Sequence, residues 1–320
     1  MKLLHISDIH FGAKFTWLEN AAQEHRERIW RTFAKAKEHC MREKIDLLLL
    51  TGDIFDSPFP AKGSKEILAK EFRELANSGV KIVILPGNHD LLETGSVWQD
   101  KAWSEIEGVF VFRNSEEKVF SIEGLAEKVS IIGNAVADKK TRKSPLVGLE
   151  DLVEKLRREE EASYIIAMAH GALDILGKGG NRPIQKEEIE QLGADYLALG
   201  DWHGVMDVSQ GEQTAWYAGS LEYLNREQEN SGFGVQVKLS RGDDLGIRAE
   251  VNKIKFSELT LEKLEINLEQ FGPDNTPQLK KEVELKADKN KIFQLKISGG
   301  STNSLALSKT VSEIERELTD

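Results

Sequence analysis

Several segments of this 320-residue chain are apolar along their whole length and then end in polar residues. The clearest is IDLLLLTGD at 45–53, in which four consecutive leucines leave no polar face. VKIVILPGNHD, YIIAMAHG and YLALGDWHG, which begin at residues 80, 164 and 196, have the same form. A strand without a polar face must be covered on both sides, which is typical of parallel strands in α/β proteins. The pattern therefore predicts a buried sheet whose strands end in polar loops.

Helical periodicity separates these strands along the chain. A first strand is predicted at 2–7, and shorter strands without helices between them are predicted at 109–133. Strands joined by crossover helices form α/β folds, in which chemistry collects at the carboxyl ends of the strands. Amphipathic helices are predicted at 20–44, 64–77 and 146–161.

The character of the sequence changes after about residue 254. Residues 255–320 contain charged segments with spaced leucines, and a final helix is predicted at 304–318. We therefore expect a large α/β domain at 1–254 and a small α+β domain at 255–320.

The polar strand ends carry residues that bind metals. His10, His89, His170 and His203 lie there, four of the seven histidines in the chain. Each motif alone has an ordinary explanation, since aspartate after glycine is common in turns and a histidine at a strand end is usually satisfied by hydrogen bonds. Carboxylate, amide and imidazole groups together suit borderline divalent metals such as Mn, Fe or Zn. A metal site is therefore predicted from SDIH at 7–10, GDIFD at 52–56, GNHD at 87–90, HG at 170–171 and GDWHG at 200–204.

The order of these five motifs resembles the binuclear metallophosphoesterase, or calcineurin-like, superfamily over residues 1–239. The resemblance implies a four-layer α/β/β/α sandwich of two mixed sheets. It also implies two divalent metal ions, Mn first, with Fe, Zn or Mg as alternatives. The implied ligands are Asp8, His10 and His203 for one metal, Asn88 and His170 for the other, and Asp53 as the bridge.

The resemblance also implies a mechanism of phosphoester hydrolysis. Two cations about 3.5 to 4 Å apart need an anionic bridge, and a metal-activated hydroxide between them would attack phosphorus. His89 would stabilise the transition state and assist the leaving group, while Asp56 accepts its other ring N–H and fixes the tautomer. Asp90 is expected to brace its loop through backbone hydrogen bonds.

Two segments are similar to SbcD-like DNA repair exonucleases, TGDIFDSPFP at 51–60 and WYAGSLE at 216–222. This similarity implies an exonuclease or endonuclease acting on DNA, with a small capping domain at 255–320. It also implies an SbcC-like coiled-coil ATPase as partner, and a homodimer is compatible with it. Two alternatives use the same residues: a phosphodiesterase or phosphatase for nucleotides or other small phosphoesters, and a metal-containing scaffold with marginal catalysis.

The last motif departs from the family, which usually closes its site with His-x-His. Here Asp201 stands in place of the first histidine. A carboxylate binds the same class of metal, at about 2.0 to 2.2 Å for zinc, so we expect Asp201 to be a ligand. The alternative is that Asp201 only orients His203. Its extra negative charge would weaken the attraction of the site for phosphate, and Trp202 beside it is expected to shield the rim or to stack on a base.

The net charge of −11 argues against nucleic-acid binding by bulk positive charge, but it does not exclude DNA as a substrate. Three basic groups are candidates for phosphate contacts. They are His25, Arg26, Arg28 and Arg31 in the first helix, KKTRK at 139–143, and the C-terminal Lys280, Lys281, Lys286, Lys289, Lys291 and Lys296.

The lengths of the apolar runs and the number of cysteines indicate where the protein is located. The sequence has neither the apolar core of a signal peptide nor a run long enough for a membrane helix, so we expect a cytoplasmic protein without membrane contact. A single cysteine, Cys40, excludes an intramolecular disulfide framework and is expected on a helix.

Overall fold

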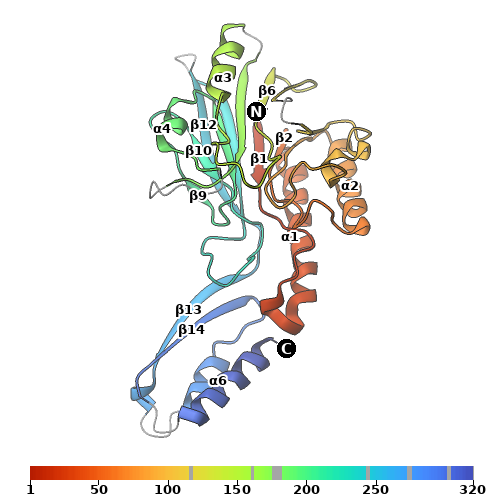
Figure 1. Ribbon diagram of the computed structural model, residues 1–320. Coiled ribbons are helices and arrows are strands. Elements are labelled where there is room, and N and C mark those ends of the chain that lie inside the picture. The colour runs from red at the N-terminus through yellow and green to blue at the C-terminus, as the bar shows by residue number, and fades with distance from the viewer. Residues whose placement is uncertain are drawn as a thin grey trace.

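The structure is a computed structural model that describes residues 1–114, 118–159, 162–174, 182–242, 246–271, 276–300 and 304–319. Two six-stranded sheets lie face to face in the upper body of Figure 1, and a smaller unit extends below them.

The first sheet has the strand order β12-β11-β1-β2-β3-β4. Strands β1 to β4 run parallel, whereas β11 and β12 add to the β1 edge in antiparallel pairings. Every residue of β2 is buried, as the run of leucines predicts. The strands are β1 (Lys2–Ile6), β2 (Leu47–Thr51), β3 (Lys81–Leu85), β4 (Val109–Val111), β11 (Phe233–Arg241) and β12 (Ile247–Lys255).

The second sheet has the order β5-β6-β7-β8-β10-β9. Strands β6, β7, β8 and β10 run parallel to one another, while the edge strands β5 and β9 pair antiparallel with β6 and β10. The strands are β5 (Val119–Ile122), β6 (Val129–Gly133), β7 (Tyr164–His170), β8 (Tyr196–Gly200), β9 (Met206–Asp207) and β10 (Ala215–Tyr217).

Helices cover the outer faces of both sheets (Figure 1). Alternate residues of β7 show the layering, because Ile166 and Met168 belong to the core between the sheets while Ile165 and Ala167 pack with the outer helices. Cys40 is buried on the inner face of α1, as expected. The helices of the sandwich are α1 (Ala22–Glu43) and α2 (Lys62–Asn77) on the first sheet, and α3 (Leu149–Arg158) and α4 (Lys186–Gln191) on the second.

The smaller unit contains the parallel pair β13 (Thr260–Asn267) and β14 (Lys291–Ser298) with α5 (Thr276–Glu284) and α6 (Ser304–Thr319). It has its own apolar cluster, which includes Leu264, Leu279 and Ile314. Arg28 on α1 ties it to the sandwich, because its Nη1 donates to Asn290 Oδ1 at 3.2 Å.

The predicted four-layer fold of two mixed sheets is therefore confirmed. Each predicted helix is observed, and its ends lie within three residues of the predicted bounds. β12 was not predicted as a strand, although its half-buried residues alternate with exposed polar ones, a pattern typical of an edge strand. Among the residues that the structure describes, no helix is long and apolar enough to cross a membrane.

Candidate metal centre

The five polar motifs meet at the carboxyl edge of the two sheets. The loops after β1 and β2 run side by side, with Asp8 N donating to Gly52 O at 3.1 Å and His10 N to Asp53 O at 3.0 Å. Asp8, His10 and Asp53 have φ values of 50°, 54° and 53°. Positive φ is uncommon for residues other than glycine, and such strain collects at functional sites.

Asp8, His10 and His203 form what we call the His10 end of the centre. One ligand atom from each lies within 4.8 Å of the others. Asp8 is fully buried and is oriented by Ser7 Oγ, which donates to its Oδ2 at 2.5 Å. The side chain of His203 is 25% exposed, and its Nε2 lies 4.0 Å from Asp8 Oδ1. This end therefore opens towards solvent at His203.

The tautomer of His10 is fixed by Asp56. Its Nδ1 donates to Asp56 Oδ1 at 3.0 Å, because a carboxylate can only accept. The other ring nitrogen, Nε2, is buried and has no hydrogen-bond partner within the described part of the chain. A buried lone pair held towards a cluster of carboxylates is the state that a metal ligand requires.

Asn88, His170 and Asp201 form the His170 end. His170 Nδ1 donates to the carbonyl oxygen of Thr51 at 2.9 Å, so the lone pair of the neutral ring is on Nε2. Three oxygens face this atom: Asn88 Oδ1 at 2.9 Å, Asp53 Oδ2 at 3.3 Å and Asp201 Oδ1 at 3.7 Å. A lone pair surrounded by acceptor oxygens needs either a second proton or a cation between them.

Two glycines make room for the His170 ring where the sheets meet. A Cβ on Gly52, whose φ is +84°, would lie 2.2 Å from His170 Nδ1. A Cβ on Gly200 would lie 1.9 Å from the Thr51 oxygen and 2.7 Å from the same ring nitrogen. Any larger residue at either position would displace the ring, so the backbone itself fixes His170.

Asp53 lies between the two ends. Its Oδ2 is 3.7 Å from His10 Nε2 and 3.3 Å from His170 Nε2, and its Oδ1 accepts the backbone N–H of His89 at 2.8 Å. Burial alone would raise the pKa of Asp53, but His170 and His10 outweigh it and hold the pKa below its usual range. The side chain is therefore an anion placed to contact both ends.

Protonation of the other buried groups follows from the crowding of carboxylates. Burial opposes a charge on His170, yet Asp53 and then Asp8 raise its pKa to about 10. Burial first, and then Asp53, raise the pKa of Asp8 to about 7. In the absence of metal, the centre thus takes up protons, which cations would displace on binding.

His89 and Asp56 lie at the exposed rim. The side chain of His89 is 42% exposed, and its Nδ1 is 3.4 Å from Asp56 Oδ1 and 3.3 Å from the Asp56 carbonyl oxygen. Hydrogen bonding to Asp56 raises the pKa of His89 against the effect of partial burial. Asp56 is shared, since its shorter contact is with His10.

Asp90 clamps the loops together, as expected. Its Oδ1 accepts from Gly87 N at 2.7 Å and Asp53 N at 3.2 Å, and its Oδ2 accepts from Ile54 N at 2.9 Å and Phe55 N at 3.2 Å. The side chain is fully buried. It therefore positions the bridging loop and the GNHD loop rather than contacting a substrate.

The residues fit a pair of divalent cations. Each end supplies an imidazole lone pair and oxygen donors, the mixture that borderline metals prefer, and Asp53 adjoins both.

The family model of the calcineurin-like phosphoesterases matches residues 1–205, well over half of the chain. The chain belongs to the calcineurin-like phosphoesterase family. This family binds divalent metal ions, and its members are hydrolases.

Individual calcineurin-like phosphoesterases are similar at modest identity. The uncharacterized metallophosphoesterase YhaO of Bacillus subtilis is 28% identical over 251 residues, which is 76% of this chain and 58% of YhaO. The DNA double-strand break repair protein Mre11 of Sulfurisphaera tokodaii is 23% identical over 318 residues, 98% of this chain and 77% of that protein. The SbcD component of the Escherichia coli nuclease SbcCD is 29% identical over 94 residues, 29% of this chain and 22% of that component. The chain thus spans little more than half the length of YhaO.

The basic residues of α1 are engaged within the chain. His25 is buried and its Nε2 bonds to Tyr223 O at 2.7 Å, so the expectation that it contacts phosphate is wrong. Arg28 reaches the smaller unit, and Arg31 pairs with Glu24 at 2.5 Å. Of the C-terminal lysines, Lys291 and Lys296 pair with Glu262 and Glu265, both at 2.9 Å.

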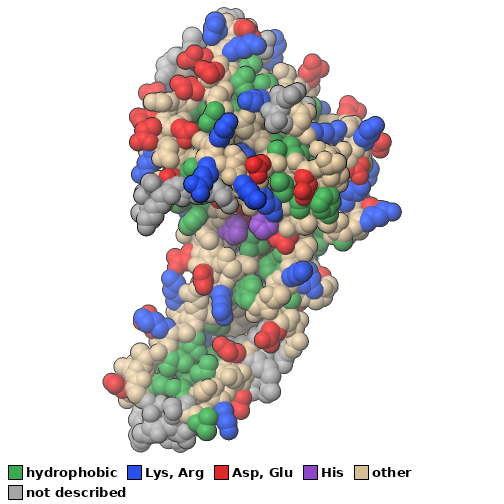
Figure 2. Space-filling model, viewed as in Figure 1, with side chains coloured by type: hydrophobic (Ala, Val, Ile, Leu, Met, Phe, Trp, Pro, Cys, Tyr) green, Lys and Arg blue, Asp and Glu red, His purple; other side chains and the backbone are tan. Residues whose placement is uncertain are grey.

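Loop 139–143 is the basic candidate that is joined to the segment beside His170. Its Lys and Arg side chains are exposed, and Thr141 O accepts the backbone N–H of Arg182, which in turn lies against Gly171, the residue after His170. Figure 2 shows Lys and Arg side chains beside the surface histidines, where the sandwich narrows towards the smaller unit. Trp202 is 46% exposed, which agrees with its expected place at the rim.

Sequence reasoning missed three groups that shape the centre. Ser7 orients Asp8, the carbonyl of Thr51 orients His170, and Arg182 is buried beside the His170 end. A serine before an aspartate could have been considered as an orienting group. A backbone carbonyl has no sequence signature, and the partners of Arg182 come from distant loops.

Proposed function

We propose that this protein is a two-metal phosphodiesterase that hydrolyses DNA, of the SbcD type. The observation that carries the proposal is the position of Asp53 Oδ2 between His10 Nε2 and His170 Nε2, with oxygen donors at both ends. When bound, two divalent cations supply a water of lowered pKa and neutralise charge on the phosphate oxygens. Mn is the proposed ion, with Fe, Zn and Mg as alternatives, and Asp201 is proposed as a ligand at the His170 end.

The chain's own residues would then act on the leaving group. Asp56 holds His89 through Nδ1, so the proton on Nε2 is directed away from Asp56. Because the His89 ring is partly exposed and its pKa is raised, it can deliver this proton to a departing alkoxide. Asp90 keeps the bridging loop in place. The ions are held by Asp8, His10, Asp53, Asn88, His170 and His203.

A pocket beside the centre supports a substrate larger than a simple phosphoester. Its volume is about 430 Å³, and its walls come from the two loops that carry Asp56 and His89. Val97 N donates to Pro58 O at 2.8 Å and joins these loops. Pro58 is two residues beyond Asp56, so at most about 7 Å of chain separates them. The pocket is therefore close enough to receive nucleotides that flank a bound phosphate.

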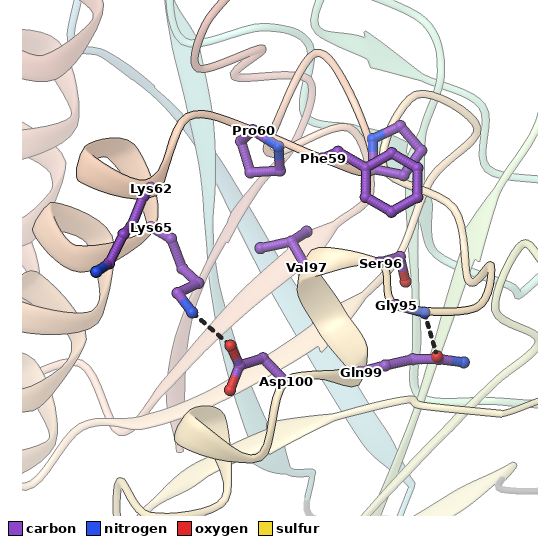
Figure 3. Close-up of a pocket in the computed structure, with 10 residues that line it drawn as sticks. Phe59, Pro60, Lys62, Lys65, Gly95, Ser96, Val97, Gln99 and Asp100 are labelled. Atoms are coloured by element: carbon purple, nitrogen blue, oxygen red, sulfur yellow. Dashed lines mark hydrogen bonds and ion pairs between the residues drawn. The ribbon is translucent and has the colours of Figure 1, made fainter.

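Aromatic and basic side chains of this pocket match DNA. Figure 3 shows Phe59 and Pro60 on one wall, with Lys65 bonded to Asp100 across the floor. Phe59 is 60% exposed, which suits stacking on a base, and the side chain of Lys62, which also lines the pocket, is 86% exposed. Loop 139–143 would add positive charge along the DNA backbone.

We also propose that residues 255–320 form a capping unit separate from a catalytic domain at 1–254. The separate apolar cluster of the smaller unit supports this division. The Escherichia coli relative is named as one component of the nuclease SbcCD, which supports a protein partner for this chain too. We propose that this partner is an SbcC-like coiled-coil ATPase. A homodimer and a cytoplasmic location stay predictions.

Cleavage assays with Mn test the proposed function. Single-stranded DNA, double-stranded DNA and bis(p-nitrophenyl) phosphate are offered to the purified protein, with a metal-free sample as control. Hydrolysis of DNA is expected. Hydrolysis of the small ester with intact DNA would instead support the small-phosphoester alternative, and two bound Mn ions without any turnover would support the scaffold.

The variant Phe59→Ala sharpens this assay. Stacking of one base on an aromatic ring contributes about 1 to 3 kcal/mol, so DNA cleavage should fall by roughly tenfold or more. Hydrolysis of the small ester should stay at the wild-type rate, because it does not reach the pocket. Leu285→Ala, which removes another exposed apolar side chain in the smaller unit, serves as the matched control.

A further inference from the structure

Arg182 is a buried cation with few hydrogen bonds. Its residue is only 7% exposed. The guanidinium Nη2 donates to Asn134 O at 2.9 Å, while Nε is buried and has no partner within the described part of the chain. Buried charges are normally paired, since an unpaired one is costly. A buried arginine whose Nε donor has no partner among the described residues therefore indicates a functional role.

The position of Arg182 places it beside the His170 end. A Cβ on Gly171 would lie 2.4 Å from Arg182 O and 3.2 Å from Arg182 Cβ, so the two residues are in close contact. Gly171 follows His170 and donates its N–H to Gly200 O at 3.1 Å. Gly200 in turn precedes Asp201. Arg182 thus packs against the backbone corner from which both His170 and Asp201 project.

The charges of Arg182 and Asp201 influence each other. Burial lowers the pKa of Arg182 to about 10, and Asp201 opposes that effect. The guanidinium therefore stays charged at neutral pH. Among the described residues no ion pair joins the two side chains, and Arg182 Nε has no hydrogen-bond partner there.

We propose that Arg182 is a positioning residue of the centre, which offsets the charge of Asp201 and attracts the phosphate of the substrate. Asp201 adds a carboxylate where the family usually has a neutral histidine, and this lowers the positive charge of the loaded centre by one unit. Arg182 restores that unit. The inference rests on the proposed metal-dependent function, but it concerns binding of phosphate rather than cleavage of DNA.

Binding measurements on charge variants test the proposal. Calorimetry gives the affinity of the metal-free protein for Mn and of the Mn-loaded protein for inorganic phosphate. Arg182→Met should bind phosphate about tenfold more weakly and Mn severalfold more tightly, the effect of one unit charge in a partly buried site. The double variant Arg182→Met/Asp201→His removes one charge of each sign, so its phosphate affinity should return to within about threefold of wild type.

A purely structural role predicts a different pattern. It would weaken both Mn and phosphate binding in Arg182→Met, and the losses in the double variant would add; either result overturns the proposal. Arg182→Lys keeps the charge and should bind phosphate like wild type, whereas Arg182→Gln should not. If Arg182→Met does not fold, the difference in phosphate affinity between the Lys and Gln variants tests the proposal instead. Equal phosphate affinities of these two variants would overturn it.

A matched control separates this inference from the proposed function. Arg157 on α3 pairs with Asp195 at 2.5 Å, before β8 and so at the opposite end of that strand from Asp201, and Arg157→Met should therefore change neither affinity. Wild-type protein that binds Mn and phosphate but leaves DNA intact would overturn the nuclease proposal and leave the role of Arg182 standing. Wild-type protein that binds neither would overturn both.

Discussion

The two ends of the candidate metal centre hold a histidine in the same tautomer by different means. His10 donates its Nδ1–H to the carboxylate of Asp56, whose side chain is 35% exposed. His170 donates to the carbonyl of Thr51, and its side chain is fully buried. A carboxylate acceptor belongs to a side chain, so it can be removed by mutation. The His10 end is therefore adjustable through a side chain, whereas the His170 end is built into the backbone.

The distribution of carboxylate charge between the two ends also differs from the usual pattern of the family. The His10 end has Asp8, and in this chain the His170 end has Asp201 where the family usually has histidine. Each cation would then have one carboxylate of its own and a share of Asp53. Two divalent cations against three carboxylates leave one net positive charge, instead of two. The negative charge of the ligands is thus divided more evenly between the two sites, but the loaded centre attracts phosphate less strongly. The positive charge of the buried Arg182 can restore this attraction.

The largest effect is expected from Asp53→Asn, which disturbs both ends at once. The amide keeps the shape but loses the anion that offsets repulsion between the cations. Fewer than two Mn ions per chain should bind. Transition-state stabilisation should fall by several kcal/mol, which is about 10³-fold or more in rate. Elemental analysis and turnover of the small ester check this, and two tightly bound Mn ions per chain would contradict the bridging role.

The next largest effect is expected from His89→Gln, which should leave both ends intact. Loss of general acid catalysis lowers turnover by about 10² to 10⁴-fold. The loss should be greater for DNA than for bis(p-nitrophenyl) phosphate, because a nitrophenolate departs without a proton. Kinetics on both substrates and the Mn content provide the measurement. Loss of one Mn ion from this variant would show that His89 is a ligand instead.

Some of this centre could be read from the sequence because it is local. A buried strand that ends in Gly-Asp or Gly-Asn-His-Asp has to deliver those side chains to the sheet edge, and parallel strands bring the edges together. Asp90 followed from the same logic, since a buried carboxylate in a tight loop must accept backbone N–H groups. The buried strands and amphipathic helices followed from apolar periodicity, whereas their arrangement as two sheets in four layers followed from the resemblance to the family.

The features that could not be read from the sequence depend on contacts between distant segments. The Thr51 carbonyl and His170 are 119 positions apart and meet only because the two sheets pack at Gly52 and Gly200. The sequence predicts His25 on the surface of a charged helix, but the distant segment around Tyr223 covers it. β12 alternates apolar and polar residues, which is compatible with an edge strand, but its pairing with β11 could not be read from the sequence.

The smallest effect is expected from Asp56→Asn, which tests the difference between the ends directly. The amide can still occupy the position, but it no longer supplies a charged acceptor to His10 Nδ1. Loss of such a partner typically weakens metal binding by about 10 to 100-fold. Two-site Mn titration should therefore show one weakened site and one unchanged site, while the exposed Asp207→Asn leaves both unchanged. Equal weakening of both sites would mean that Asp56 supports the whole centre, and the contrast between an adjustable and a backbone-fixed end would be wrong.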